Sequence, residues 1–265
     1  PQNIIWNGPI KDPEKMEELL LKGGTVNFDS LEEWDAVKKI SEKWPMNTLN
    51  VGIRCNFDVQ DGVLSRFGFD VTSHDFYSLI DDVKNTNNIC LINLQCHYAK
   101  RQVEFWPARA QGMIDLIDKL DIIPQRIDLG GGLFGKMPAS LKAQFDYDIP
   151  DYSAYAHAAA TVFSERFAGM ADKMPELIIE PGSALVGDCM KFVATVKTIK
   201  QVRGKYMAAV LGSQKNISMQ GINPPIEIYH LSSTRQSYSD LDFVGFTCIE
   251  NDVLYKHYKG ELAVG

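Results

Sequence analysis

Two glycine-containing segments and one cysteine are the parts of this sequence best suited to chemistry. The first segment, Asp128-Leu129-Gly130-Gly131-Gly132, begins in an apolar run that is typical of a strand. Because glycine has no Cβ, a backbone at the end of a strand can bring successive N–H groups against an anion, and phosphate is the natural ligand. The second segment ends the apolar run 177–179 with Glu180-Pro181-Gly182-Ser183. The cysteine is Cys248, in Gly245-Phe246-Thr247-Cys248.

The composition is that of an ordinary globular protein. Of the 265 residues, 45% are hydrophobic and 23% are charged, which excludes a disordered or low-complexity chain. The net charge is −7 and Lys and Arg form no cluster, so we expect no nucleic-acid partner. No apolar run approaches the ~20 residues of a membrane span, so we expect no membrane partner either.

The cysteines indicate a reducing environment. Their number is odd, no close pair has metal-ligand spacing, and no signal-peptide stretch precedes them, so we expect a cytoplasmic protein without a metal site. Cys55, Cys90 and Cys96 lie inside apolar runs and are expected in the core.

Strand-like and helix-like segments alternate over the first two thirds of the chain, which predicts parallel βα units. Helices are expected after the capping residues Asp12 and Ser30, the first of them ending at Gly23-Gly24. Leu31 should share the buried face of the second helix with Trp34, Val37 and Ile40. Further strands are expected at 3–8, 25–28, 49–55, 90–96, 126–129 and 176–179, with helices over 110–120 and 152–167.

These units predict an α/β fold class, a (β/α)8 TIM-type barrel of which about six units are present. From about residue 190 the apolar residues alternate with period 2, as in 192–199 and 206–210, and no long helix follows. We therefore expect a barrel domain at 1–190 that lacks its first strands, and part of an antiparallel β domain at 191–265. Both ends of the sequence are abrupt, so truncation at both ends is expected.

The order of these motifs resembles one family, the pyridoxal-phosphate-dependent decarboxylases that include diaminopimelate and ornithine decarboxylase. Ser65-Arg66-Phe67-Gly68 is similar to the family's Lys/Arg-Phe-Gly motif, and Cys96-His97-Tyr98-Ala99 stands where the family has His-Ile-Gly-Ser. The resemblance implies a barrel beside a β domain, pyridoxal 5'-phosphate as the cofactor, and decarboxylation of an amino acid or amino-acid-like metabolite.

The resemblance also implies roles for single residues. His97 would stack on the cofactor ring, Glu180 would pair with the ring nitrogen, and Cys248 would protonate the substrate's α-carbon, with Asp252 ordering its loop. In the family the cysteine segment reaches the neighbouring subunit, which implies a homodimer with shared active sites. The phosphate would lie on Gly130, Gly131, Gly132, Gly182 and Ser183.

Each of these roles has a plainer alternative. The glycine triplet could be a tight βα turn without a ligand, and Glu180 a surface or helix-capping residue. His97 could be a structural histidine, and Cys248 a small buried hydrophobe. A Rossmann dinucleotide site is disfavoured, because the glycines lack the required spacing.

The sequence departs from the family pattern at several positions. Ser183 replaces an arginine, Lys100 a phosphate-binding serine, and Ile249 an acidic residue that meets the substrate's distal amine. These changes within the motifs predict a substrate that differs from a simple diamine precursor. The family's covalent cofactor lysine and a late phosphate-binding tyrosine are expected to lie outside the given sequence, in keeping with truncation at both ends.

Two other functions stay open. One is an amino-acid racemase of the same barrel, although such enzymes set an arginine against the ring nitrogen and this chain has Glu180. The other is a cofactor-free homologue that regulates an enzyme subunit by pairing with it.

Overall fold

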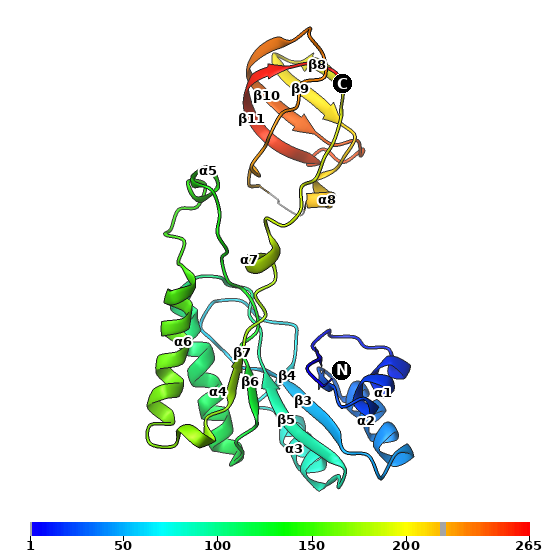
Figure 1. Ribbon diagram of the computed structural model, residues 1–265, viewed down its shortest axis with the longest axis vertical. Helices are drawn as coiled ribbons and strands as arrows, with labels where there is room; N and C mark the ends of the chain where they lie inside the picture. The colour runs from blue at the N-terminus through cyan, green and yellow to red at the C-terminus, as the bar shows by residue number, and fades with distance from the viewer. Residues whose placement is uncertain (1, 218–220) are drawn as a thin grey trace. The chain divides into compact units, whose positions relative to one another are not determined.

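The computed structural model describes residues 2–217 and 221–265, which form two compact units. The first unit extends to Gly135 and includes Pro150–Leu185. The second unit consists of Lys136–Ile149 and Val186–Gly265 (Figure 1). The main chain therefore passes from one unit to the other at Leu185 and Val186, and the excursion 136–149 groups with the second unit.

The first unit is built on a parallel sheet with the strand order β1-β2-β3-β5-β6-β7. Every neighbouring pair on this path is parallel, and β4 (Phe69–Asp70) pairs with β3 off the path. The predicted parallel α/β architecture is confirmed. The strands on the path are β1 (Ile5–Trp6), β2 (Thr25–Phe28), β3 (Leu49–Asn56), β5 (Ile89–Gln95), β6 (Arg126–Asp128) and β7 (Glu176–Ile178).

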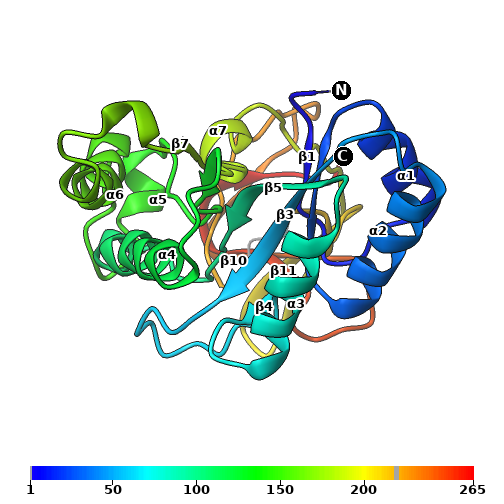
Figure 2. The ribbon, with the colours of Figure 1, turned by 90° about the horizontal axis from the view of Figure 1, so that it is seen from below.

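Five helices are ranged along the outside of this sheet (Figure 2). They are α1 (Pro13–Leu21), α2 (Leu31–Lys43), α3 (His74–Asn85), α4 (Trp106–Leu120) and α6 (Tyr152–Arg166). Buried strand residues such as Ile53 and Leu94 share one core with helix residues such as Met113 and Phe163. The described residues also contain short helical segments in both units: η1 (Val103–Phe105), α5 (Ala139–Lys142), η2 (Ala171–Lys173), α7 (Ser183–Val186) and α8 (Gln214–Ile217).

Local sequence signals set the helix ends as predicted. The Asp12 carboxylate accepts a hydrogen bond from the Lys15 N–H at 3.0 Å, and Pro13 occupies the first turn of α1. Ser30 caps α2 in the same way. The prediction for Leu31 is wrong, because this first residue of α2 precedes the packed turns and is 44% exposed.

Cys90 also departs from the prediction. Cys55 and Cys96 are buried, but Cys90 is exposed. The reason is that β5 becomes fully buried only from Ile92 onward, so its first residues lie at the margin of the core.

The second unit contains a four-stranded sheet with the order β11-β10-β9-β8. Its strands are β8 (Val196–Val202), β9 (Lys205–Val210), β10 (Gln236–Val244) and β11 (Val253–Leu262). The outer pairs are antiparallel as expected, but β9 and β10 are parallel, so the sheet is mixed. The long connection 211–235 allows this, since it returns the chain to the end at which β9 began. No helix in the described ranges combines the length and the apolar character that crossing a bilayer requires.

Candidate functional site

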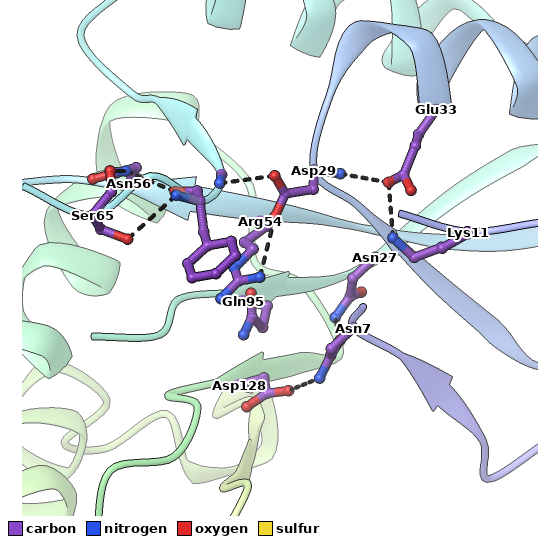
Figure 3. A network of polar contacts seen from close by, with 12 residues as sticks. Asn7, Lys11, Asn27, Asp29, Glu33, Arg54, Asn56, Ser65, Gln95 and Asp128 are labelled. Atoms are coloured by element: carbon purple, nitrogen blue, oxygen red, sulfur yellow. Dashed lines mark hydrogen bonds and ion pairs between the residues drawn. The ribbon is translucent and has the colours of Figure 1, made fainter. Parts of the chain in front are cut away.

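Polar side chains gather where the parallel strands of the first unit end. The carboxyl ends of parallel strands share one edge of a sheet, and this is where α/β folds place their sites. Asn7 follows β1, His97 follows β5, the glycine triplet follows β6, and Glu180 follows β7. Figure 3 shows part of this polar edge.

The glycine loop ties three strand ends together. The Gly130 carbonyl accepts a hydrogen bond from the Glu180 N–H at 2.9 Å, and the Gly131 N–H donates to His97 Nδ1 at 3.0 Å. Gly130 has φ +71°, a left-handed conformation that side chains disfavour. A Cβ on Gly131 would lie 2.5 Å from the Glu180 carbonyl oxygen. Glycine is therefore needed here for the strand ends to come this close.

The hydrogen bond from Gly131 fixes the state of His97. A backbone N–H can only donate, so Nδ1 is an acceptor and the neutral ring carries its proton on Nε2. Burial lowers the pKa of His97, and the nearby Glu180 carboxylate only partly opposes this. The site thus presents a neutral imidazole.

Two carboxyl groups lie next to each other at the ends of β6 and β7. Asp128 is fully buried, whereas Glu180 is partly exposed and its Oε1 accepts a hydrogen bond from Gln95 Nε2 at 2.9 Å. Burial, followed by the charge of Glu180, raises the pKa of Asp128 to about 7. Protonated Asp128 can donate a hydrogen bond to the Glu180 carboxylate.

A directional chain of amides ends at Asp128. Asn93 Nδ2 donates to Asn27 Oδ1 at 2.9 Å, Asn27 Nδ2 donates to Asn7 Oδ1, and Asn7 Nδ2 donates to Asp128 Oδ2 at 3.0 Å. The other Asp128 oxygen accepts the Gly130 N–H at 2.8 Å. Asp128 therefore links the interior of the sheet to the turn of the glycine loop. Figure 3 shows its contact with Asn7.

A second charged network lies beside β2 and β3 (Figure 3). Lys11 pairs with Glu33 at 2.8 Å, and Arg54 pairs with Asp29 at 3.1 Å. Asp29 also accepts the Gly68 N–H at 3.2 Å. This network fixes the predicted Arg-Phe-Gly motif against the sheet.

A buried arginine lies behind the glycine loop. Arg109 on α4 is 0% exposed, and its guanidinium donates to the Gly131 carbonyl at 2.7 Å and to the Lys100 carbonyl at 2.6 Å. Its aromatic neighbours are Trp106 and Tyr98, with ring centroids 4.8 and 5.6 Å from Cζ. No sequence pattern singles out this residue, since a helical arginine is usually exposed.

In the second unit, Asp252 orders the loop that carries Cys248, which confirms that expectation. Its Oδ2 accepts from Thr247 Oγ1 at 2.5 Å, and its Oδ1 accepts from Ser213 Oγ and from the Gln214 N–H at 2.9 and 2.7 Å. Cys248 itself is exposed, so it is not the buried hydrophobe of the plainer alternative. Its catalytic role stays a prediction.

One cluster in the second unit has the residue types of a metal site. Asp240, Asp242 and His257 offer ligand atoms within 4.8 Å of one another. However, Lys205 Nζ already lies 2.5 Å from Asp240 and 3.0 Å from Asp242. The lysine supplies the positive charge that a metal would otherwise bring.

The structure thus brings His97, Gly130, Gly131 and Glu180 together at one edge of the sheet, and their roles toward a cofactor stay predictions. Ser183 is exposed and begins α7. Gln95, Asp128 and Asn7 were missed as site residues. A signal existed for Gln95, because Asn93 and Gln95 alternate with apolar residues in β5 and therefore face the same side of the sheet.

Comparison with known proteins identifies the family of this arrangement. Residues 1–187 match the family model of the pyridoxal-dependent decarboxylases that describes their pyridoxal binding domain. The chain belongs to this family. Its cofactor is pyridoxal phosphate.

The relatives of this decarboxylase-family chain are distant. It is 26% identical to the diaminopimelate decarboxylase of Actinosynnema pretiosum subsp. auranticum over 96% of the chain and 58% of that protein. The diaminopimelate decarboxylase structure from M. jannaschi has a TM-score of 0.79 at 20% identity, covering 100% of this chain and 62% of that one. The Helicobacter pylori diaminopimelate decarboxylase complexed with L-lysine has a TM-score of 0.78 at 19% identity, over 100% and 66%.

The chain therefore spans about three fifths of the length of these proteins. At these identities the solved structures show the shared fold.

The residues at the strand ends fit this cofactor. In the described ranges, the N–H groups of Gly132 and Gly182 donate to no other protein group, which leaves them for the oxygens of a phosphate. Gln95 holds Oε1 of Glu180, and the Glu180 side chain is partly exposed, so its carboxylate can meet a protonated ring nitrogen. The N–H groups of Gly130 and Gly131 are already engaged within the protein, so these two glycines shape the loop.

We predict that Asp128→Asn removes a pH dependence of stability. The pKa of Asp128 is about 7 in the folded protein and ~3.9 in an unfolded chain, so between these values the folded state binds more protons. The parent's free energy of unfolding should therefore fall as pH rises from 4 to 7. The variant should gain stability relative to the parent over this range, by a few kcal/mol at most.

Urea unfolding of the cofactor-free proteins at several pH values measures this difference. Asp172→Asn, at an exposed carboxylate, is the control and should follow the parent. If the free energy of unfolding changes with pH in the same way in the Asp128 variant and the parent, the raised pKa of Asp128 is contradicted.

Proposed function

We propose that this protein is a pyridoxal-phosphate-dependent decarboxylase acting on an amino acid or amino-acid-like metabolite. The observation that carries the proposal is the meeting of His97, the glycine loop and Glu180 at one edge of the parallel sheet. The curated relatives cited above are diaminopimelate decarboxylases, and an arginine decarboxylase of Paramecium bursaria Chlorella virus bound to agmatine has the same fold. Their names support an amino-acid-like substrate.

Each group at the strand ends has a task in this reaction. Bound pyridoxal phosphate supplies the electron sink for the electrons released when a carboxylate leaves. Gly132 and Gly182 hold the phosphate through their N–H groups, beside Ser183. The Glu180 carboxylate keeps a proton on the ring nitrogen, and Gln95 fixes the orientation of that carboxylate. His97 offers a neutral ring face for stacking.

Cys248 supplies the proton that must return to the substrate's α-carbon. A thiol with an ordinary pKa of ~8.5 is protonated at neutral pH and can transfer its proton from Sγ. We place this residue in the site of a partner subunit, in a homodimer with shared active sites. Asp252 supports the role, because its hydrogen bonds fix the loop while Cys248 stays exposed.

The proposed substrate differs from a simple diamine precursor. Ile249, which is 54% exposed beside Cys248, offers no charge to a distal ammonium group. Burying an ammonium without a partner costs several kcal/mol. We further propose a reducing, cytoplasmic setting, which the five free cysteines support.

Glu180 also separates the proposal from its alternatives. A carboxylate at the ring nitrogen deepens the electron sink, which favours decarboxylation over the racemase alternative. A regulatory homologue without cofactor would have no need for a carboxylate that Gln95 orients.

We predict that Glu180→Gln binds the cofactor but loses turnover. The charged hydrogen bond to the ring nitrogen is stronger in the transition state than in the ground state, so kcat should fall about a hundredfold. The measurement is CO2 release by the intact protein at equal cofactor occupancy, over a panel of amino acids and their carboxylated or conjugated derivatives. Glu176→Gln, at the exposed start of the same strand, is the matched control.

A Glu180 variant as fast as the parent would contradict contact with the ring nitrogen. A parent protein that binds no cofactor would favour the regulatory alternative.

We predict that subunit mixing restores activity lost by single variants. If each site combines Glu180 of one subunit with Cys248 of the other, a mixed dimer of Glu180→Gln and Cys248→Ala has one intact site and one doubly damaged site. With half of the dimers mixed, activity should recover to about a quarter of the parent level.

Cys189→Ala, at another exposed cysteine, is the control variant and should be fully active. No recovery after verified subunit exchange would contradict a shared site.

A further inference from the structure

Arg109 is a buried cation that forms no ion pair within residues 2–217 and 221–265. Its side chain is 0% exposed, and its hydrogen bonds to these residues go to the backbone carbonyls of Gly131, Lys100 and Tyr98, at 2.7, 2.6 and 3.4 Å. Its Nε has no hydrogen-bond partner within the described part of the chain. The arginines that form ion pairs there are Arg54, Arg126, Arg166 and Arg235.

Burying a charge in this way is costly unless a counter-charge lies near. An unpaired buried ion loses its hydration, and carbonyl dipoles and aromatic faces return only part of that energy. Asp61 is a buried carboxylate whose charge acts on Arg109, but the two form no ion pair in the described part of the chain. Its Oδ1 accepts the Val63 N–H at 2.9 Å, and its Oδ2 has no hydrogen-bond partner there, so it offsets the arginine charge only from a distance. The surroundings of Arg109 would therefore be stabilised by an added anion.

The geometry of one peptide bond indicates where that anion binds. In a trans peptide the C=O and N–H groups point to opposite sides. Arg109 holds the carbonyl of Gly131, so it aims the N–H of Gly132 away from itself. That N–H is one of the donors left without a partner in the described part of the chain. Gly132 has φ +84°, so this orientation depends on glycine.

We propose that Arg109 is the positioning residue of the phosphate site: it fixes the Gly131–Gly132 peptide with its N–H toward the cofactor phosphate and supplies positive potential from behind the loop. The inference rests on the proposed function, because it takes the cofactor phosphate as the anion. Arg109 acts through the peptide and does not itself touch the ligand. Its positive charge polarises the peptide, so the N–H becomes a stronger donor.

A purely structural role is the competing account. Buried arginines can simply join loops by binding carbonyls, here those after β5 and β6. Such a role would stabilise the fold without favouring a phosphorylated ligand over an unphosphorylated one. The two accounts therefore differ in how Arg109 affects the contribution of the phosphate group to binding.

The test compares two ligands, pyridoxine 5'-phosphate and pyridoxine, which differ only in the phosphate and form no covalent bond with lysine. Calorimetry of the intact cofactor-free protein gives the ratio of their Kd values for the parent, Arg109→Met and Arg109→Lys. Lys119→Met removes a positive charge from the exposed end of the same helix and serves as the matched control. Pyridoxine affinity reports whether each variant keeps the rest of the site.

The parent and the Lys119 variant should favour the phosphorylated ligand by the same factor. In Arg109→Met this factor should fall about tenfold or more, with pyridoxine affinity unchanged, and Arg109→Lys should lie between the two. If the ratio of the two Kd values is unchanged in Arg109→Met, or if both ligands lose affinity equally, the role of Arg109 is overturned while the proposed function stands. A parent without preference for the phosphorylated ligand would overturn the proposed phosphate site as well.

A second measurement decides the case if Arg109→Met fails to fold. Phosphorus NMR of pyridoxine 5'-phosphate bound to the parent should show a phosphate that stays dianionic well below its ordinary pKa of ~6. A bound phosphate that titrates as it does in free solution would overturn the inference.

Discussion

The buried carboxyl group of Asp128 is the constraint on which the rest of the site depends. One of its oxygens accepts the N–H of Gly130 and sets the turn after β6, while the other ends the amide chain that begins at Asn93. Its neighbour Glu180 comes from the next strand, so two carboxyl groups meet where water is largely excluded. Protonation of Asp128, whose pKa is raised, relieves their repulsion, and a cation would relieve it further.

That constraint explains why the site suits a ligand with a positive end and a negative end. A protonated ring nitrogen would offset the repulsion between Asp128 and Glu180. At the other end of the glycine loop, a phosphate would offset the unpaired charge of Arg109. The loop itself is neutral, and its role is geometric: without Cβ atoms it lets the strand ends approach and leaves the N–H of Gly132 free. One side of this short loop therefore lacks a positive charge beside the two carboxyl groups, and the other side lacks a negative charge beside Arg109.

Much of this could be read from the sequence where a local rule governs the structure. The caps at Asp12 and Ser30, the alternation of strands and helices, and the glycine triplet after a strand all follow from short-range physics. What failed depends on tertiary context. Whether Cys90 or Leu31 is buried is decided by how far the packed layer extends. The parallel pairing of β9 with β10 is set by a long connection without a strong pattern.

In the site, too, local sequence rules predict some features and tertiary context decides the others. The convergence of His97, the glycines and Glu180 was predictable from motif order, but the hydrogen bonds among them were not. Gly130 and Gly131 use their N–H groups for Asp128 and His97, so fewer donors face the ligand than the motif alone suggests. Arg109 carries no sequence signal, because its importance comes from the loop against which α4 places it.

The central claim is that the Glu180 carboxylate meets the ring nitrogen of the cofactor, and nitrogen NMR of ring-labelled pyridoxal phosphate bound to the intact protein tests it most directly. The account predicts a protonated ring nitrogen that keeps its proton to higher pH than in the free cofactor, and loss of this effect in Glu180→Gln. The same nitrogen shift and the same pH dependence in parent and variant would contradict it.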